Sequence, residues 1–138
     1  MTKDLQSLIE EARQGLAAAQ QLQDRYDAVG WQIKDSSFTK VRHMLYHLMK
    51  VTADVAALVE NVEHALYDGT SSEQAARDFD EVMKERSDLG GELLFLAAQL
   101  ANLGQSNLAD ETVKIYGRNA QRFAPNSEFA DLKQRTAS

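Results

Sequence analysis

Carboxylates recur at helical spacing in two parts of this chain. Glu60 and Glu63 form one pair, and Glu85 and Asp88 form another, each within a segment that has the pattern of a long amphipathic helix. Mg²⁺ binds carboxylate oxygens and usually keeps waters and phosphate oxygens in its remaining positions. If the two helices face one another, these side chains could bridge a magnesium ion to a phosphorylated substrate.

The positions of these acids relative to the apolar residues favour a metal site. Glu63 falls beside the apolar seam of its helix and Glu60 lies one step farther out, while Glu85, Asp88 and Glu92 line one face of the next helix. Carboxylates beside a core are costly unless a cation or hydrogen bonds compensate their charge. A bound cation would supply that compensation.

A solvated helix face explains the same acids without a metal. Asp and Glu make up 21 of the 138 residues, so acid pairs at this spacing are common on exposed helices. Lys50, Lys84 or Arg86 could then pair with them in solvent. The sequence leaves both interpretations open.

A basic face lies near the C-terminus. Lys114, Arg118 and Arg122 are spaced at four residues, and such a stripe can bind phosphates through charge-assisted hydrogen bonds. The same cations also stabilise the C-terminal end of a helix, where they offset its negative pole. Phosphate binding and helix capping are therefore both compatible with this stripe.

Other common site motifs are missing from the sequence. His43 and His47 are four residues apart, but the His-Glu-x-x-His signature is absent, and we expect ordinary helix-surface or partly buried histidines. There is no Gly-rich phosphate loop and no nucleophile elbow. The chain contains no cysteine, which excludes thiolate metal sites and cysteine catalysis. No catalytic residue is assigned.

Composition and charge indicate a helical protein of the cytoplasm. One Pro, seven Gly and 7% aromatic residues favour helices over a sheet. A formal charge of −6 gives no general attraction to nucleic acid or to anionic lipid. No apolar run approaches the roughly 20 residues of a membrane span, and the N-terminus has no apolar signal core. We therefore expect neither nucleic acid nor membrane as a partner.

The apolar spacing predicts four helices, at about residues 4–28, 36–67, 71–103 and 108–123. Short connections favour an antiparallel four-helix bundle, within a single domain over residues 1–124. Residues 125–138 are expected to form a polar tail with one short turn near Glu128 to Leu132. Gly90 and Gly91 interrupt the third pattern, where they permit a break or the close approach of another backbone.

Local residues predict where these helices begin and end. Gly30 ends the first helix, and Asp68-Gly69-Thr70 breaks the pattern after the second. Ser71 with Gln74 resembles a capping box that opens the third helix, and Asn107 can cap the fourth. Arg86 occupies the one place in the third stripe where the spacing calls for an apolar residue.

The second helix carries more apolar residues than one neighbour can cover. Its main three-four stripe is Phe38, Val41, Leu45, Leu48, Thr52, Val55, Val59, Val62 and Leu66. Met44, Val51 and Leu58 widen this stripe on one flank, and Met49 and Ala56 widen it on the other. We therefore expect contacts with several neighbours and a homodimer or larger assembly.

The second half of the chain resembles a known family. The segments Gly91-Glu92-Leu93-Leu94-Phe95 and Leu100-Ala101-Asn102-Leu103-Gly104, followed by Arg118 through Arg122-Phe123, resemble the MazG-like domains, as does His47-Leu48-Met49. These domains are all-α nucleoside triphosphate pyrophosphohydrolases. The resemblance covers about residues 38–123.

The resemblance admits two registers. Aligned on Glu92-Leu93-Leu94-Phe95, the family's acidic positions fall on Lys50, Val51, Asp54, Leu89 and Glu92, which leaves only Asp54 and Glu92 as ligands. Aligned on the acid spacing, Glu60, Glu63, Glu85 and Asp88 fill the motif, but the Leu-Leu-Phe segment is displaced by about one helical turn. The first register implies a lost or remodelled site, and the second an active-type site.

The resemblance implies Mg²⁺-dependent cleavage of a nucleoside triphosphate to the monophosphate and pyrophosphate, with Mn²⁺ as an alternative metal. The ligands would be Glu63, Glu85, Asp88 and Glu92, with Glu60 and Asp54 in reserve, and Lys114, Arg118 and Arg122 would reach the phosphates. The alternative is a catalytically inactive helical module that dimerises or binds a partner helix through its apolar faces. Lys50 and Val51 favour this alternative.

Overall fold

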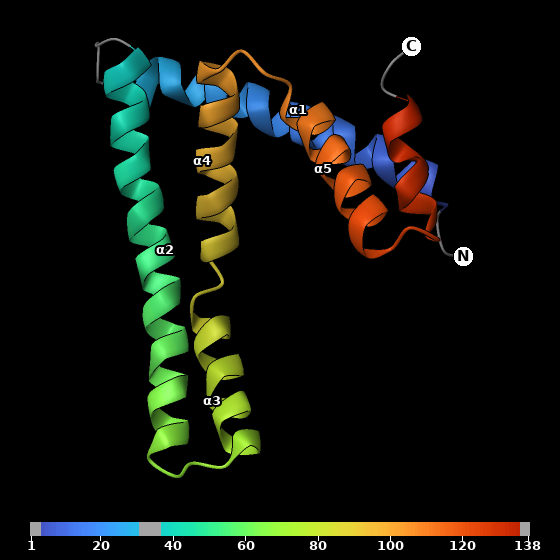
Figure 1. Cartoon of the computed structure of the whole chain (residues 1–138). Coiled ribbons are helices and arrows are strands. Elements are labelled where there is room, and N and C mark those ends of the chain that lie inside the picture. The colour runs from blue at the N-terminus through green and yellow to red at the C-terminus, as the bar shows by residue number, and fades with distance from the viewer. Residues whose placement is uncertain (1–3, 31–36, 136–138) are drawn as a thin grey trace. The chain divides into compact units, whose positions relative to one another are not determined.

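The computed structural model describes residues 4–30 and 37–135, and every regular element within them is helical. The all-α prediction is therefore confirmed. None of the described helices is long and apolar enough to cross a membrane. In chain order the elements are α1 (Leu5–Gly30), α2 (Ser37–Tyr67), α3 (Ser72–Glu85), α4 (Leu89–Leu103), α5 (Leu108–Phe123) and the 3₁₀ helix η1 (Glu128–Arg135), as Figure 1 shows.

The chain divides into two compact units. Unit 1 contains the described residues of 1–32 and 97–138, and unit 2 contains those of 33–96. Unit 1 therefore holds α1, the second part of α4, α5 and η1, while unit 2 holds α2, α3 and the first part of α4. The single domain expected over residues 1–124 stays a prediction.

Unit 2 is built around a hairpin in which α2 runs alongside α3 and then the beginning of α4 (Figure 1). Gly69 makes the turn possible because its φ of 90° lies in the left-handed region that favours glycine. Ser71 caps α3, since its hydroxyl accepts a hydrogen bond from the Gln74 backbone N–H at 3.2 Å. The Gln74 side chain does not complete the expected capping box; it donates to Asp78 instead.

The third predicted helix is two helices. The break lies at residues 86–88, just before Gly90 and Gly91, which belong to the first turn of α4. A Cβ placed on either glycine would meet nothing within 4 Å. Close approach of another backbone, one of the two roles considered for these glycines, is thus not seen among the described residues.

The core of unit 2 uses one flank of the α2 apolar surface. Val51, Leu89 and Leu96 are buried together, and half-buried Leu48, Val55, Leu58 and Met83 pack against them. Met44 is also buried. By contrast, Phe38, Leu45, Val59 and Leu66, which belong to the predicted main stripe, are exposed. The inward face of α2 is therefore centred on the flank that contains Met44, Val51 and Leu58, because these residues follow the same three-four spacing.

Unit 1 has an interior of small side chains and amides. Ala98, Ala101, Ala109, Val113 and Ala120 are buried, and α5 contacts both α1 and η1. The segment predicted to be a polar tail with one short turn near Glu128 to Leu132 contains η1, whose Leu132 is also buried. The predicted cap of α5 is confirmed, since the Asn107 side chain accepts from the Asp110 N–H at 3.0 Å.

Two buried glutamines connect helices of unit 1 through one carboxylate. Gln23 on α1 and Gln99 on α4 each donate a side-chain hydrogen bond to Asp27 Oδ1, at 2.9 and 2.8 Å. Nearby, Gln20 donates to the Ser106 carbonyl and accepts from the Leu108 N–H. Buried amides need such partners because an unpaired polar group in an interior is costly.

Candidate functional site

Arg86 brings together two of the acids proposed as metal ligands. Its Nη2 lies 3.4 Å from Asp54 Oδ2 on α2, and its Nε lies 3.3 Å from Asp88 Oδ1. Arg86 follows the last residue of α3, where the chain leaves the helix and its side chain can reach α2. The sequence pattern required an apolar residue here, and the guanidinium is half-buried instead.

The charges around Arg86 are mutually stabilising. The hydrogen bond to Asp88, followed by attraction to the Asp88 and Asp54 carboxylates, raises the pKa of Arg86 above its usual value despite some desolvation. Since arginine is already charged at any ordinary pH, this shift adds no pH-dependent switch. The distances to Asp54 and Asp88 place the guanidinium where its charge compensates two carboxylates.

The remaining predicted ligands do not gather around a common point. Glu60 Oε1 lies 3.7 Å from Nε2 of His64 on the same helix. The side chains of Glu63, Glu85 and Glu92 are exposed. Within residues 4–30 and 37–135, no three His, Asp or Glu side chains are arranged to hold a metal ion. The Mg²⁺ site stays a prediction.

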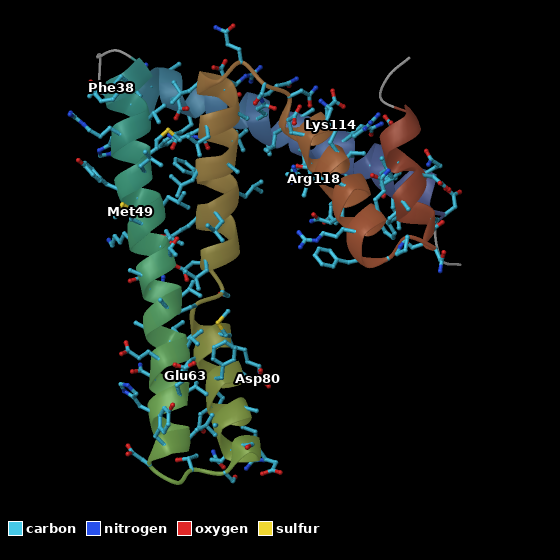
Figure 2. The ribbon with its side chains drawn as sticks, viewed as in Figure 1. Phe38, Met49, Glu63, Asp80, Lys114 and Arg118 are labelled. Carbon is cyan, nitrogen blue, oxygen red and sulfur yellow. The ribbon has the colours of Figure 1, made fainter. Side chains whose placement is uncertain are left out.

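The predicted phosphate-binding residues are all exposed on α5, four residues apart along the helix. Figure 2 labels two of them, Lys114 and Arg118. Lys114 Nζ lies 2.7 Å from Glu111 Oε1, a hydrogen bond that raises the pKa of Lys114. The Arg122 guanidinium carbon lies over the Phe123 ring, 4.9 Å from its centroid. Arg118 lies between Lys114 and Arg122 in the sequence. The acids belong to unit 2 and these cations to unit 1.

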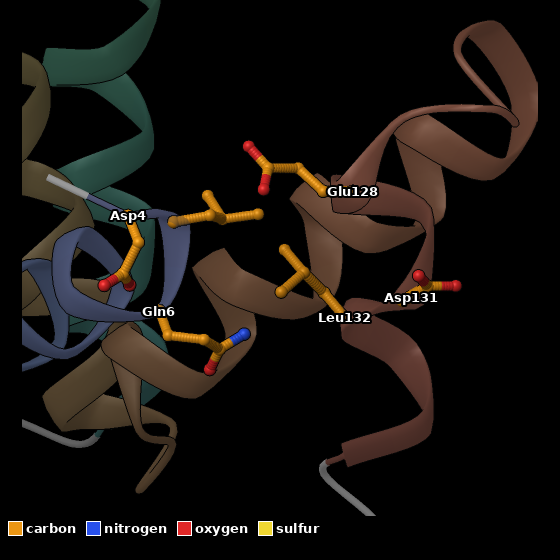
Figure 3. A pocket seen from close by; sticks show the side chains of 6 residues that line it. Asp4, Gln6, Glu128, Asp131 and Leu132 are labelled. Atoms are coloured by element: carbon orange, nitrogen blue, oxygen red, sulfur yellow. The ribbon is translucent and has the colours of Figure 1, made fainter. Parts of the chain in front are cut away.

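An acidic hollow in unit 1 was not foreseen from the sequence. It has a volume of about 280 Å³, opens to solvent, and is lined by Asp4, Leu5, Gln6, Glu128, Asp131 and Leu132. Figure 3 shows Asp4 and Glu128 on opposite sides of it, with the Asp131 carboxylate directed away from Asp4. The carboxylates are thus spread out, and no local sequence signal links residues so far apart in the chain.

A second apolar surface runs along the exposed side of α2. We define the outer stripe as Phe38, Leu45, Met49, Thr52, Ala53, Ala56, Val59 and Leu66, all exposed. Phe38 and Met49, labelled in Figure 2, are 72% and 67% exposed, which is unusual for side chains of this size. Sequence reasoning placed most of these residues on the wide apolar surface of this helix, which it expected several neighbours and a homodimer or larger assembly to cover.

Comparison with family models, with curated proteins and with solved structures found no match.

Proposed function

We propose that this protein is an assembly module that associates with other protein chains, including copies of itself, through exposed apolar helix faces. The outer stripe supports this proposal most strongly. A contiguous exposed apolar surface is characteristic of an interaction site, whereas single exposed apolar residues are not. Burying one large aliphatic or aromatic side chain contributes about 1.5–3 kcal/mol, so a row of them can support association.

The first part of α4 adds a second apolar surface in unit 2. Leu93, Leu94 and Phe95 are each about half exposed, although α4 is apolar almost all round. A helix with this composition is normally covered on more than one side. Leu89 and Leu96 pack in the unit 2 core, whereas the exposed Leu93 and Leu94 add apolar surface that a partner could cover.

Sedimentation over a range of protein concentrations tests the assembly proposal. We expect wild type to form oligomers, and Met49→Ser to shift the equilibrium toward monomer because it removes an exposed apolar side chain from the outer stripe. The matched control is Asp80→Ser, which changes an exposed residue on α3 and should leave assembly unchanged. A wild-type protein that stays monomeric at every concentration, and whose monomer is unaffected by Met49→Ser, would contradict self-assembly.

A second candidate function is Mg²⁺-dependent hydrolysis of a nucleoside triphosphate to the monophosphate and pyrophosphate. The observation in its favour is the convergence of Asp54 and Asp88, which come from different elements and lie within 3.4 Å of the same guanidinium. Oxygen donors of this kind suit Mg²⁺, which would neutralise phosphate charge and activate water. Arg86 already compensates both carboxylates, so metal binding would require this side chain to move.

In this candidate function Glu63, Glu85, Asp88 and Glu92 would be the ligands, with Glu60 and Asp54 in reserve. Lys114, Arg118 and Arg122 would contact phosphate. Thermal melting with and without millimolar Mg²⁺ tests the metal site, because a ligand of the folded state raises the midpoint. Asp88→Asn should abolish that rise, and Asp80→Asn should preserve it. No rise for wild type, together with no pyrophosphate release from any common nucleotide, would exclude the hydrolase.

A further inference from the structure

We propose that the outer stripe binds the same stripe of a second copy of this chain, with the two α2 helices antiparallel about a twofold axis near Thr52. This inference rests on the assembly function and specifies its partner and its geometry. The argument uses the charges beside the stripe, the register of its apolar residues and the small residues at its centre.

Exposed charge changes sign along α2. Arg42 and Lys50 lie in the first half of the helix, and Glu60 and Glu63 lie in the second half, all of them exposed. No ion pair of Arg42, Lys50 or Glu63 occurs among the described residues. A helix with one basic half and one acidic half is complementary to an antiparallel copy of itself, whereas a parallel copy would bring like charges together.

The apolar residues fall into register in the same arrangement. With Thr52 on the axis, Phe38 of one copy lies opposite Leu66 of the other, and Leu45 lies opposite Val59. Each contact occurs twice, as a twofold interface requires. In the same register the position opposite Arg42 is one residue away from Glu63, so these two opposite charges lie close together. One placement of the two helices therefore satisfies both the apolar and the charged residues.

The centre of the stripe permits close approach. Thr52, Ala53 and Ala56 are small, so two helix backbones could come together there without displacing large side chains. The Thr52 hydroxyl already donates to the Leu48 carbonyl of its own helix at 2.8 Å. Burying it in an interface would therefore leave no unpaired donor.

At the Phe38 end of the stripe, a positive charge is positioned where it can meet an acidic partner. The Arg42 guanidinium lies over the Phe38 ring, 5.7 Å from its centroid, which keeps its aliphatic part along the helix surface. An opposing carboxylate would meet a charge that is already positioned. A helix from a different protein would need the same reversal of charge along its length. A second copy of this chain has that reversal because its sequence is identical.

A charge exchange tests the arrangement in the full chain. We expect Arg42→Glu and Glu63→Arg each to weaken the wild-type dimer roughly tenfold, since each replaces two attractive pairs by two repulsive ones. An equimolar mixture of the two variants should restore the wild-type dissociation constant, because every facing pair is then of opposite sign. Failure of the mixture to associate better than either variant alone would overturn the antiparallel register.

Cysteine cross-linking gives an independent measurement, since the chain contains no cysteine. In the proposed dimer the two copies of residue 52 face each other across the axis. Two Thr52→Cys side chains should therefore form a disulfide under mild oxidation, since bridged Cα atoms are usually about 4.4–6.8 Å apart and closely packed helices allow that separation. Ala57→Cys, also exposed on α2 but outside the stripe, should not cross-link efficiently.

The outcomes separate this inference from the assembly function. A dimer that is insensitive to both charge variants and that does not cross-link through position 52 would overturn the α2 pairing while assembly still holds. A chain that stays monomeric at every concentration, with no cross-link, would overturn both.

Discussion

The two compact units are stabilised in different ways. Unit 2 buries large aliphatic side chains such as Val51, Leu89 and Leu96 between the helices of a hairpin. Unit 1 buries mainly alanines, and Gln23 and Gln99 meet at Asp27 in its interior. Apolar packing tolerates many arrangements of similar area, whereas a half-buried carboxylate with two buried amide donors requires one specific arrangement.

This contrast locates the assembly function proposed for the protein. Unit 2 has more large apolar side chains than its hairpin covers, and its outer stripe supports the assembly proposal. In unit 1 the specific contacts are hydrogen bonds within its own interior. Variants that affect the two interiors differently therefore examine whether this contrast is real.

The largest effect is expected for the apolar core of unit 2. Leu96→Ala should lower the free energy of unfolding by about 2–4 kcal/mol, because it removes buried contacts and leaves a cavity. Leu94→Ala on the same helix is the control, since Leu94 is 43% exposed, and should cost clearly less. Urea denaturation at one fixed protein concentration measures both. Equal losses would show that Leu96 is not a core residue.

The polar interior of unit 1 should respond to the loss of one acceptor. Asp27→Ala leaves the buried side chains of Gln23 and Gln99 without that hydrogen bond, and we expect a loss of about 2 kcal/mol. Asp27→Asn keeps an acceptor oxygen and should cost less. If chemical denaturation gives the two variants the same stability, the hydrogen bonds to this oxygen do not stabilise unit 1.

The helix caps provide a comparison in which the units should behave alike. Ser71 caps α3 in unit 2 and Asn107 caps α5 in unit 1, each by accepting a backbone N–H. Replacing either by alanine should cost about 1 kcal/mol, since a cap acts locally and does not depend on the interior. A markedly larger loss at one of them, in denaturant titrations of both variants, would mean that the side chain also has a tertiary role.

The smallest effect, and a stabilising one, is expected at the end of α4. Gln105 has a φ of 51°, in the left-handed region where glycine is favoured, whereas Gly69 already serves the corresponding turn in unit 2. Gln105→Gly should raise the free energy of unfolding by up to about 1 kcal/mol by relieving backbone strain. A rise in melting temperature checks this, and a fall would indicate that the Gln105 side chain contributes more than the strain costs.

Local signals predicted the elements well. The starts of α3 after Ser71 and of α5 after Asn107, and the turn at Gly69, were predicted from local residues. These features and the all-α class follow from hydrogen bonds and caps that involve residues a few positions apart. The break before α4 was anticipated at the glycines but lies three residues earlier, where Arg86 turns toward Asp54. The local pattern did not show that Arg86 pairs with a residue of another helix at this break.

The candidate sites were harder to predict, since they join residues distant in the chain. The acid spacing identified Asp88, and the family resemblance identified Asp54, as groups that could meet a cation. The sequence named Arg86 together with Lys50 and Lys84 as possible partners of the helix acids, but it could not choose among them. Spacing also could not choose which side of the wide apolar surface of α2 faces inward, because two overlapping stripes have the same period. The helices follow from backbone bonding within each segment. The inward side of α2 and the partner of Arg86 follow from contacts that exist only once the helices have packed.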